Sequence, residues 1–290
     1  MDKRLEKLKM EYKNIPIPKD LDSIVTKAIN RSRKKKFPFK TLTGLTAAAI
    51  FIFSLNTSQI FAQSLANVPG LRNVVKVLTF KEYTVNESTY NAEIKVPSVS
   101  NLKNKELERS LNQKYLQENK QLYDEFTKEM EEMKKKNGGH LGIESSYEVK
   151  TDTSSILSIG RYTVNTVGSS STTMKYDTID KKKEVLLTLP ILFKDQSYID
   201  VISENIKQQM KDQMKADPNK IYWIRNAGVE NPIDPFEKIN ENQNFYINKD
   251  NKLVISFNKY DVAPGYMGIV EFVIPTEILS NILVGNQYIN

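Results

Sequence analysis

Cysteine and histidine, two residue types common in catalytic and metal sites, are absent or nearly absent from this sequence. None of the 290 residues is cysteine, which excludes disulfides, thiolate metal sites and cysteine nucleophiles. The only histidine is His140, so a zinc site made of several histidines is excluded, and a Ser-His-Asp arrangement could use only this residue. Because His140 follows two glycines at the predicted end of a helix, we interpret it as a solvated surface histidine.

The common catalytic motifs are also missing. The sequence has no Gly-rich phosphate loop, no GxSxG, no HExxH and no aspartate cluster with metal spacing. Acidic pairs such as Glu131-Glu132 lie on a charged helix face and are most simply solvated, and no spacing singles out a pair for a two-carboxylate hydrolase. We therefore expect a protein that is not an enzyme and that uses neither a metal nor another cofactor.

One loop has residues suited to binding. Residues 260–268, with the sequence YDVAPGYMG, connect two predicted strands. Pro264 and Gly265 favour a rigid turn, which would direct Tyr266 and Met267 either outward or into the core. An outward tyrosine would make a preformed recognition loop with an aromatic anchor, whereas an inward one would only cap the core.

The elements around this loop predict an α+β fold with antiparallel sheets. A long helix is expected over residues 102–136, because apolar residues recur at helical spacing from Leu107 to Met133, and a second helix over 198–215. A short final helix should begin at Pro275-Thr276. Alternating or β-branched runs predict the strands, at residues 83–96, 145–150, 154–167, 171–176, 245–247, 253–257 and 268–274.

The net charge of +7 is concentrated at the N-terminus. Residues 1–40 hold 13 of the 42 Lys and Arg residues but only 5 of the 35 Asp and Glu residues. The rest of the chain is close to neutral. The basic isoelectric point is thus a property of the tail, and we expect no direct binding of nucleic acid.

An apolar segment follows the basic residues. No charged residue occurs between Lys40 and Arg72, and a helix over residues 41–62 would be about 33 Å long, enough to span a bilayer. The cluster from Arg31 to Lys40 predicts a single span with the N-terminus in the cytoplasm and the C-terminal domain outside the cell.

The same segment has the features of a secretory signal. A basic region and an apolar region precede Ser64-Leu65-Ala66, whose small residues suit a signal peptidase site. Ile60-Phe61-Ala62 is a weaker second choice because Ile60 is large. A region of about 40 residues before the apolar segment is long for a removable signal, so we interpret the segment as a signal anchor that can be cut.

Two amphipathic helices are predicted before the membrane. The first, near residues 2–12, places Leu5 and Leu8 on one face, and the Pro-rich stretch 15–18 ends it. The second, over residues 19–33, has apolar residues at helical spacing, namely Leu21, Ile24, Val25, Ala28 and Ile29. The pair could lie on the inner leaflet or fold onto another protein, and the stripes interrupted by prolines favour a protein partner.

Several parts of the sequence resemble a known family. The opening MDKRLEKLKMEYKNIPIPKDLDSIVTKA, the basic patch with the apolar segment, and the late FNKYDVAPGYMGIVEFVIP are similar to the RsiV-like anti-sigma-V factors of low-GC Gram-positive bacteria. The resemblance implies a cytoplasmic tail that holds an extracytoplasmic-function sigma factor. It also implies an outer part of two modules that binds C-type lysozyme, and release of the sigma factor by signal peptidase and an intramembrane protease.

Carried to this sequence, the resemblance assigns roles to particular residues. It places Pro264, Tyr266 and Met267 of the late loop against lysozyme, with Ser169 and Ser170 beside them, although this earlier loop lacks the Gly-Gly-Ala-His-Gly stretch often seen in wider relatives. It places the cut at Ser64 to Ala66. The sigma factor would bind the tail stripes, with Leu5, Leu8, Leu21, Ile24, Val25 and Ile29.

Four regions are therefore expected. They are a sigma-binding tail (1–36), a signal anchor with its cleavage region (37–66) and two outer modules (67–183 and 184–290). The alternative is a membrane-anchored cell-wall enzyme or its carbohydrate-binding accessory module. The tail discriminates between them, because an enzyme anchor needs no amphipathic helices inside the cell.

Overall fold

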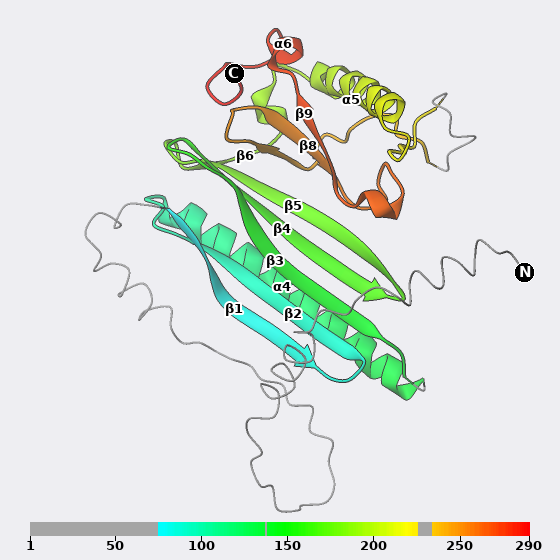
Figure 1. Ribbon diagram of the computed structural model, residues 1–290. Coiled ribbons are helices and arrows are strands. Elements are labelled where there is room, and N and C mark those ends of the chain that lie inside the picture. The colour runs from blue at the N-terminus through cyan, green and yellow to red at the C-terminus, as the bar shows by residue number, and fades with distance from the viewer. Residues whose placement is uncertain (1–74, 137, 226–233) are drawn as a thin grey trace, which may run out of the picture. The chain divides into compact units, whose positions relative to one another are not determined.

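The described part of the chain folds as two sheets, each covered by a helix. The computed structural model describes residues 75–136, 138–225 and 234–290. A six-stranded sheet comes first, and a three-stranded sheet follows (Figure 1). This confirms the predicted α+β class for the described residues.

The six-stranded sheet follows the chain order from β1 to β6. Its strands are β1 Lys76–Asn86, β2 Tyr90–Ser100, β3 Leu141–Asp152, β4 Ile156–Val167, β5 Ser169–Asp180 and β6 Val185–Leu187. Neighbours are antiparallel except β2 and β3, which are parallel. The expectation of purely antiparallel sheets is wrong at this pair, because α4 (Lys105–Lys135) returns the chain across the sheet before β3 begins.

The predicted strand over residues 83–96 is two strands. A turn at Glu87 divides the run, and the Glu87 N–H donates to the Tyr90 carbonyl (2.9 Å). The alternation of apolar side chains continues through the turn, so Tyr83 and Val85 of β1 and Ile94 and other residues of β2 are all buried. Periodicity alone therefore did not reveal the hairpin.

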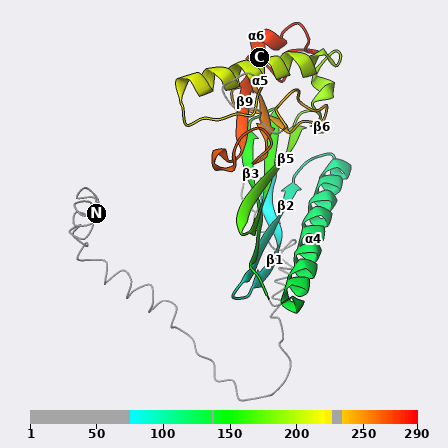
Figure 2. The same ribbon diagram turned by 90° about the vertical axis from the view of Figure 1, so that its right-hand side faces the viewer.

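Helix α4 closely matches its prediction. It begins three residues later than expected because the Asn104 side chain caps it, accepting from the Leu107 N–H at 3.1 Å. Lys134 and Lys135 lie in the last turn, where cations suit the helix dipole. The helix covers one face of the six-stranded sheet (Figure 2). The apolar stripe is buried there, with Leu111, Tyr115, Phe126 and Met130 inside.

The second sheet consists of β7 Phe245–Ile247, β8 Leu253–Phe257 and β9 Val270–Ile274, all antiparallel. Helix α5 (Ser197–Ala216) packs on it through Ile202, Ile206 and Met210. Two short 3₁₀ helices, η1 (Pro190–Leu192) and η2 (Gly265–Met267), and the short α6 (Thr276–Leu279) complete this part.

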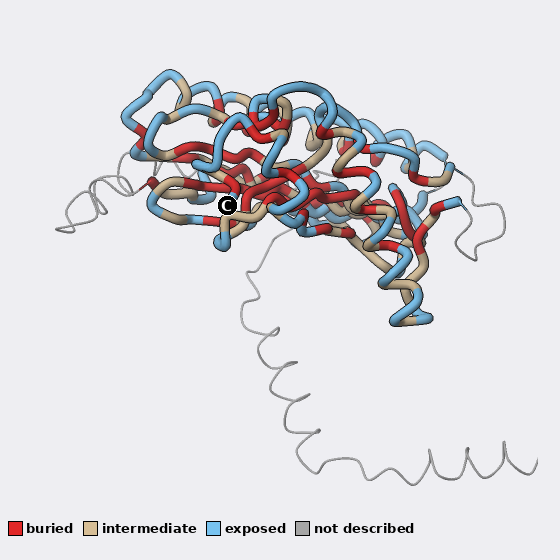
Figure 3. Tube along the Cα trace, turned by 90° about the horizontal axis from the view of Figure 1, so that it is seen from above, coloured by how far each residue is buried: buried red, intermediate tan, exposed pale blue. Residues whose placement is uncertain are grey.

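Two hydrophobic cores lie within the described residues. One joins α4 to the six-stranded sheet, and the other joins α5 to the three-stranded sheet. Buried residues run along the strands while the outer helix faces are exposed (Figure 3). Ile156 of β4 and Leu187 of β6 belong to the first sheet, but their side chains lie in the second core. The two sheets are thus in contact, and residues 75–290 contain both cores.

Candidate functional site

The late loop is a short, well-anchored turn between β8 and β9. Val262 and Ala263 are buried, and Pro264 (φ −57°, ψ 150°) leads into η2. The Met267 N–H donates to the Pro264 carbonyl at 2.9 Å. Gly268 ends η2 at φ +67°, a conformation that favours glycine. The turn expected from Pro264 and Gly265 is therefore present as a single turn of 3₁₀ helix.

Gly265 is required by its neighbour as well as by the turn. A Cβ atom at this position would lie 2.3 Å from a ring carbon of Tyr260. The Tyr260 ring thus packs directly over the glycine backbone, and Tyr260 itself adopts φ 76°. The loop surface therefore depends on a residue without a side chain at position 265.

Tyr266 and Met267 point in different directions. The Tyr266 side chain is 65% exposed, and its hydroxyl donates to the Asn219 carbonyl (2.8 Å). Met267 is partly buried and packs against the second core. Of the two orientations left open by the sequence, the tyrosine takes the outward one. The hydrogen bond holds the exposed aromatic ring in one orientation.

The earlier loop lies beside the late loop. Gly168 (φ +74°) makes the turn between β4 and β5, and Ser169 and Ser170 begin β5. The Lys259 ammonium donates to the Ser170 carbonyl (2.6 Å) and contacts the Ser170 hydroxyl (2.9 Å). The Lys259 backbone N–H donates to the Thr172 carbonyl at 3.1 Å. The structure thus connects the start of β5 with the start of the late loop.

Lys259 and Asn219 were not identified from the sequence. Lys259 lies directly before the predicted loop. A polar side chain at the end of a strand was the one sequence feature that could have indicated its role. Asn219 contributes only a backbone carbonyl, which has no sequence signal. His140 is exposed, as expected.

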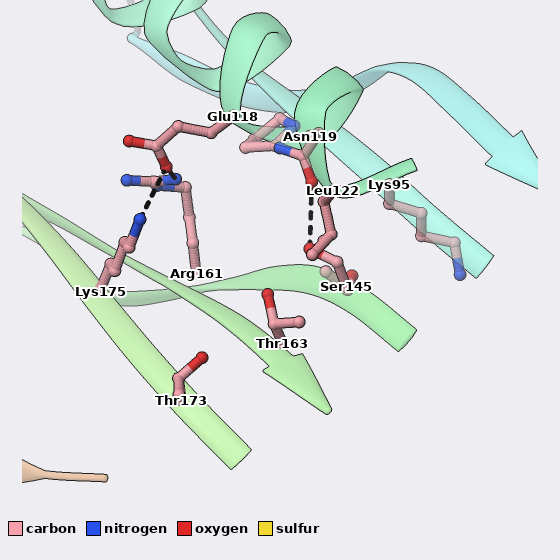
Figure 4. A pocket seen from close by; sticks show the side chains of 11 residues that line it. Lys95, Glu118, Asn119, Leu122, Ser145, Arg161, Thr163, Thr173 and Lys175 are labelled. Carbon is pink, nitrogen blue, oxygen red and sulfur yellow. Dashed lines mark hydrogen bonds and ion pairs between the residues drawn. The ribbon is translucent and has the colours of Figure 1, made fainter. Parts of the chain in front are cut away.

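A second candidate is a small polar pocket between α4 and the six-stranded sheet (Figure 4). Its volume is about 90 Å³, and Glu118, Asn119, Ser145, Arg161 and Lys175 are among the residues that line it. The Asn119 side-chain oxygen accepts from the Ser145 hydroxyl at 3.0 Å. Arg161 pairs with Glu118 at 2.7 Å and with the buried Asp177 at 3.2 Å.

The charged side chains in and around this pocket form ion pairs. Lys114 also reaches Asp177 (2.8 Å), and the Arg161 guanidinium lies over the Tyr115 ring, 4.5 Å from its centroid. Burial raises the pKa of Glu118, but the hydrogen bond and charge of Arg161 outweigh burial and leave this pKa below its usual value. A carboxylic acid that acts as a general acid near neutral pH needs a pKa raised above its usual value. The arrangement therefore suits a structural ion-pair network that holds α4 on the sheet.

Other predicted sites lie outside the described residues. These are the cleavage residues Ser64 and Ala66, the predicted membrane span and the sigma-binding stripes of the tail. In the part of the chain that the structure describes, no helix combines the length and apolar character needed to span a membrane.

Two family descriptions match separate parts of the chain. Residues 191–277 match the family described as "Protein of unknown function (DUF3298)". Residues 84–166 match the family described as "Deacetylase PdaC". The late loop lies in the first match, whereas Glu118 and Arg161 of the polar pocket lie in the second.

A solved structure shares this fold. A crystal structure of a DUF3298 family member from Bacteroides fragilis is 18% identical, with a TM-score of 0.52, and the similarity covers 74% of this chain and 96% of that chain. A DUF3298 family protein from Pseudomonas aeruginosa is 10% identical over the same shares, with a TM-score of 0.46.

One curated relative matches from end to end. The anti-sigma-V factor RsiV of Bacillus subtilis (strain 168) is 50% identical over 291 residues, which cover 100% of both chains. Identity at this level over the full length extends through the N-terminal residues and both regions matched by the family descriptions. The chain therefore belongs to the family of the anti-sigma-V factor RsiV.

Proposed function

We propose that this protein is a membrane-anchored anti-sigma factor that senses lysozyme. The tail (1–36) holds an extracytoplasmic-function sigma factor in the cytoplasm, the signal anchor (37–66) crosses the membrane once, and the two outer modules (67–183 and 184–290) face the cell wall. The observation that carries the proposal is the full-length identity of 50% with a protein named anti-sigma-V factor.

The geometry of the late loop supports C-type lysozyme as the ligand. Lysozyme has a deep sugar-binding cleft, and an exposed aromatic ring on a stiff loop suits insertion into a cleft. Tyr266 supplies that ring, and Pro264 limits the freedom of the unbound loop. The contact of Lys259 with Ser170 holds the start of β5, which includes Ser169, beside this loop.

Release of the sigma factor follows from cleavage of the anchor. Binding of lysozyme exposes the Ser64 to Ala66 region to signal peptidase, and an intramembrane protease completes the release. Ala66→Trp should block the first cut, because the protease pocket accepts only a small side chain. On an immunoblot of lysozyme-treated cells the shorter product should disappear. If it remains, the cut is elsewhere, and Ala62 is the next candidate.

The alternative of a cell-wall enzyme or carbohydrate-binding accessory module has one supporting observation, the match of residues 84–166 to a deacetylase family. The paired charges around Arg161 and the lowered pKa of Glu118 favour a structural role for that part. The full-length relative favours the regulator.

The deciding experiment tests the tail. Ile24→Asp with Ile29→Asp should free the sigma factor and switch on its target genes without lysozyme, because two unpaired charges in the interface cost several kcal/mol. The matched control is Ser23→Asp with Thr26→Asp, which adds the same charge on the polar face and should still repress. Full repression by the Ile24/Ile29 variant would exclude this stripe as the interface. A membrane pull-down with the tail should recover a sigma factor.

A further inference from the structure

A turn at the start of the late loop holds a tyrosine in a backbone conformation that suits glycine. The Asp261 N–H donates to the Asn258 carbonyl (3.0 Å), which closes a turn of four residues, and Tyr260 is the third of these with φ 76°. A positive φ at this position is typical of a type II turn, where glycine or asparagine is the usual residue. A bulky side chain is strained there, and strained residues of this kind cluster at binding and catalytic sites.

The Tyr260 side chain is not part of a hydrophobic core. It is 44% exposed and belongs to neither of the two cores formed by the described residues. Its hydroxyl forms no hydrogen bond with a described residue, whereas the Tyr266 hydroxyl donates to the Asn219 carbonyl. Core packing therefore does not account for a strained tyrosine at position 260. The exposed ring and its hydroxyl are available to a ligand.

The Tyr260 ring adjoins both groups of residues proposed to contact lysozyme. It packs over the backbone of Gly265, directly before Tyr266, where a Cβ atom would overlap the ring and its hydroxyl. The Lys259 ammonium lies 5.1 Å from the ring centroid and also donates to the Ser170 carbonyl (2.6 Å). Tyr260 therefore contacts one neighbour of Tyr266 and one of Ser170. We expect a ligand that touches both of these residues to reach the Tyr260 ring as well.

We infer that the Tyr260 ring is a second aromatic contact for lysozyme, beside Tyr266, and that the strained turn serves to present it. The inference rests on the proposed function, because it takes lysozyme as the ligand of the late loop. Tyrosine offers a large contact area for little loss of side-chain freedom, and it is enriched among the residues that contribute most to binding. Removal of the ring should lower the affinity for lysozyme about tenfold.

The first test replaces the strained tyrosine in the full chain, which is purified in detergent and titrated with a C-type lysozyme. Asparagine tolerates a positive φ, so Tyr260→Asn should keep the melting temperature within about 3 °C of wild type. Its affinity for lysozyme should fall about tenfold. The matched control is Phe80→Asn, which removes a ring of nearly equal exposure (43%) from β1, at the opposite edge of the six-stranded sheet from β6. This control should bind lysozyme like wild type.

A second change displaces the ring without removing it. The Cβ atom of Gly265→Ala would take the space of the Tyr260 ring end, so the ring must turn aside. Gly265→Ala should therefore lower the affinity about as much as Tyr260→Asn. The double variant should bind no more weakly than either single variant, because both changes remove the same contact. Losses that multiply in the double variant would contradict the inference.

Photochemical cross-linking tests the contact directly. Benzoylphenylalanine in place of Tyr260 should attach to lysozyme on illumination, and the same group in place of Phe80 should not. Unchanged affinity of Tyr260→Asn, or no cross-link from position 260, overturns the inference. A loss of affinity that comes with a larger fall in melting temperature than about 3 °C also overturns it, because the ring would then only support the loop. If wild type binds lysozyme and Tyr260→Asn binds equally well, the proposed function stands without this contact. A wild-type chain that does not bind lysozyme overturns both.

Discussion

The side-chain oxygen of Asn258, which directly follows β8 of the second sheet, accepts a hydrogen bond of 2.8 Å from the backbone N–H of Met174 in β5 of the first sheet, 84 positions away in the chain. Asn244 donates to the carbonyl of the same Met174 at 2.8 Å. Together with the Lys259 contact to Thr172, these bonds cover the part of the β5 edge that β6 leaves open. The second sheet thus protects an edge that could otherwise pair with another chain.

Asn258→Ala should therefore affect stability and recognition together. Loss of the acceptor leaves the Met174 N–H without a partner, which should lower the free energy of unfolding by about 1–3 kcal/mol. Lysozyme affinity should fall severalfold, because the loop that begins at Asn258 loses its attachment to β5. Thermal melting and lysozyme titration of the outer part measure the two effects. The exposed Asn286→Ala is the control, and identical behaviour of the two variants would contradict this role.

Tyr266→Ala should separate binding from folding. The exposed ring contributes little to the core, so the melting temperature should stay within a few degrees of wild type. Loss of an aromatic anchor should cost about 2 kcal/mol of binding, or about thirtyfold in affinity for a C-type lysozyme. Wild type should form a one-to-one complex and inhibit lysozyme.

Three further variants sharpen this test. Tyr266→Phe removes only the bond to Asn219 and should lie between wild type and Tyr266→Ala. Pro264→Gly should cost less than Tyr266→Ala, since it only restores freedom to the unbound loop. Val284→Ala is the control at the same exposure of 65% and should bind normally. A Tyr266→Ala protein that melts earlier but binds normally would end the recognition-loop proposal.

Arg161→Gln should destabilise the outer part strongly. It leaves the buried Asp177 without its guanidinium partner, and breaking a buried ion pair costs about 3–5 kcal/mol. Arg161→Gln with Asp177→Asn should recover part of the loss, because position 177 then no longer holds a buried charge with only Lys114 beside it. The exposed Arg109→Gln should melt like wild type. Lysozyme affinity at low temperature should be unchanged in all three, and an unchanged melting temperature for Arg161→Gln would refute the structural role.

Asp180 should make stability depend on acid pH. Burial raises its pKa, but hydrogen bonds from the Lys183 and Lys182 N–H groups and the Tyr288 hydroxyl leave this pKa below its usual value. A lowered folded-state pKa contributes stability above the unfolded pKa of about 3.9, and this stability is lost as pH falls through the folded value.

Asp180→Asn should thus lower the free energy of unfolding by about 1–3 kcal/mol at pH 7. The difference from wild type should shrink below about pH 4. Denaturant unfolding from pH 7 to pH 2.5 measures the difference, with the exposed Glu132→Gln as control. The same difference at pH 3 as at pH 7 would show that the carboxylate charge is not the cause.

Much of the fold was predictable in segments where apolar residues recur at a single spacing over many residues. The 3.6-residue spacing from Leu107 to Met133 predicted α4, and the predicted and observed limits of α5 differ by one residue at each end. The pairing of β2 with β3 was not predictable from the sequence. The strand beside which β3 lies depends on how α4 packs across the sheet, and no local pattern contains this information. The short β6 was missed because a strand of three residues has too little pattern.

The site was predictable in part. Pro264 and Gly265 indicated a turn, but the direction of Tyr266 depends on the Asn219 carbonyl and on the burial of Val262 and Ala263. The contact of Lys259 with Ser170 depends on how the sheets meet, which no local pattern contains. The tail, cleavage and lysozyme assignments remain predictions.

The parallel contact between β2 and β3 also has a kinetic consequence. It comprises five residue pairs, from Tyr90 with Leu141 to Ile94 with Ser145, and the whole of α4 separates the two strands in the chain. The hairpins on either side close through short turns, so they can form early. The pairing of β2 with β3 forms later, because it requires closure of a long loop and docking of α4. Contacts between residues distant in sequence form slowly. Pulsed hydrogen exchange during refolding should therefore find the β4–β5 amides protected before those between β2 and β3.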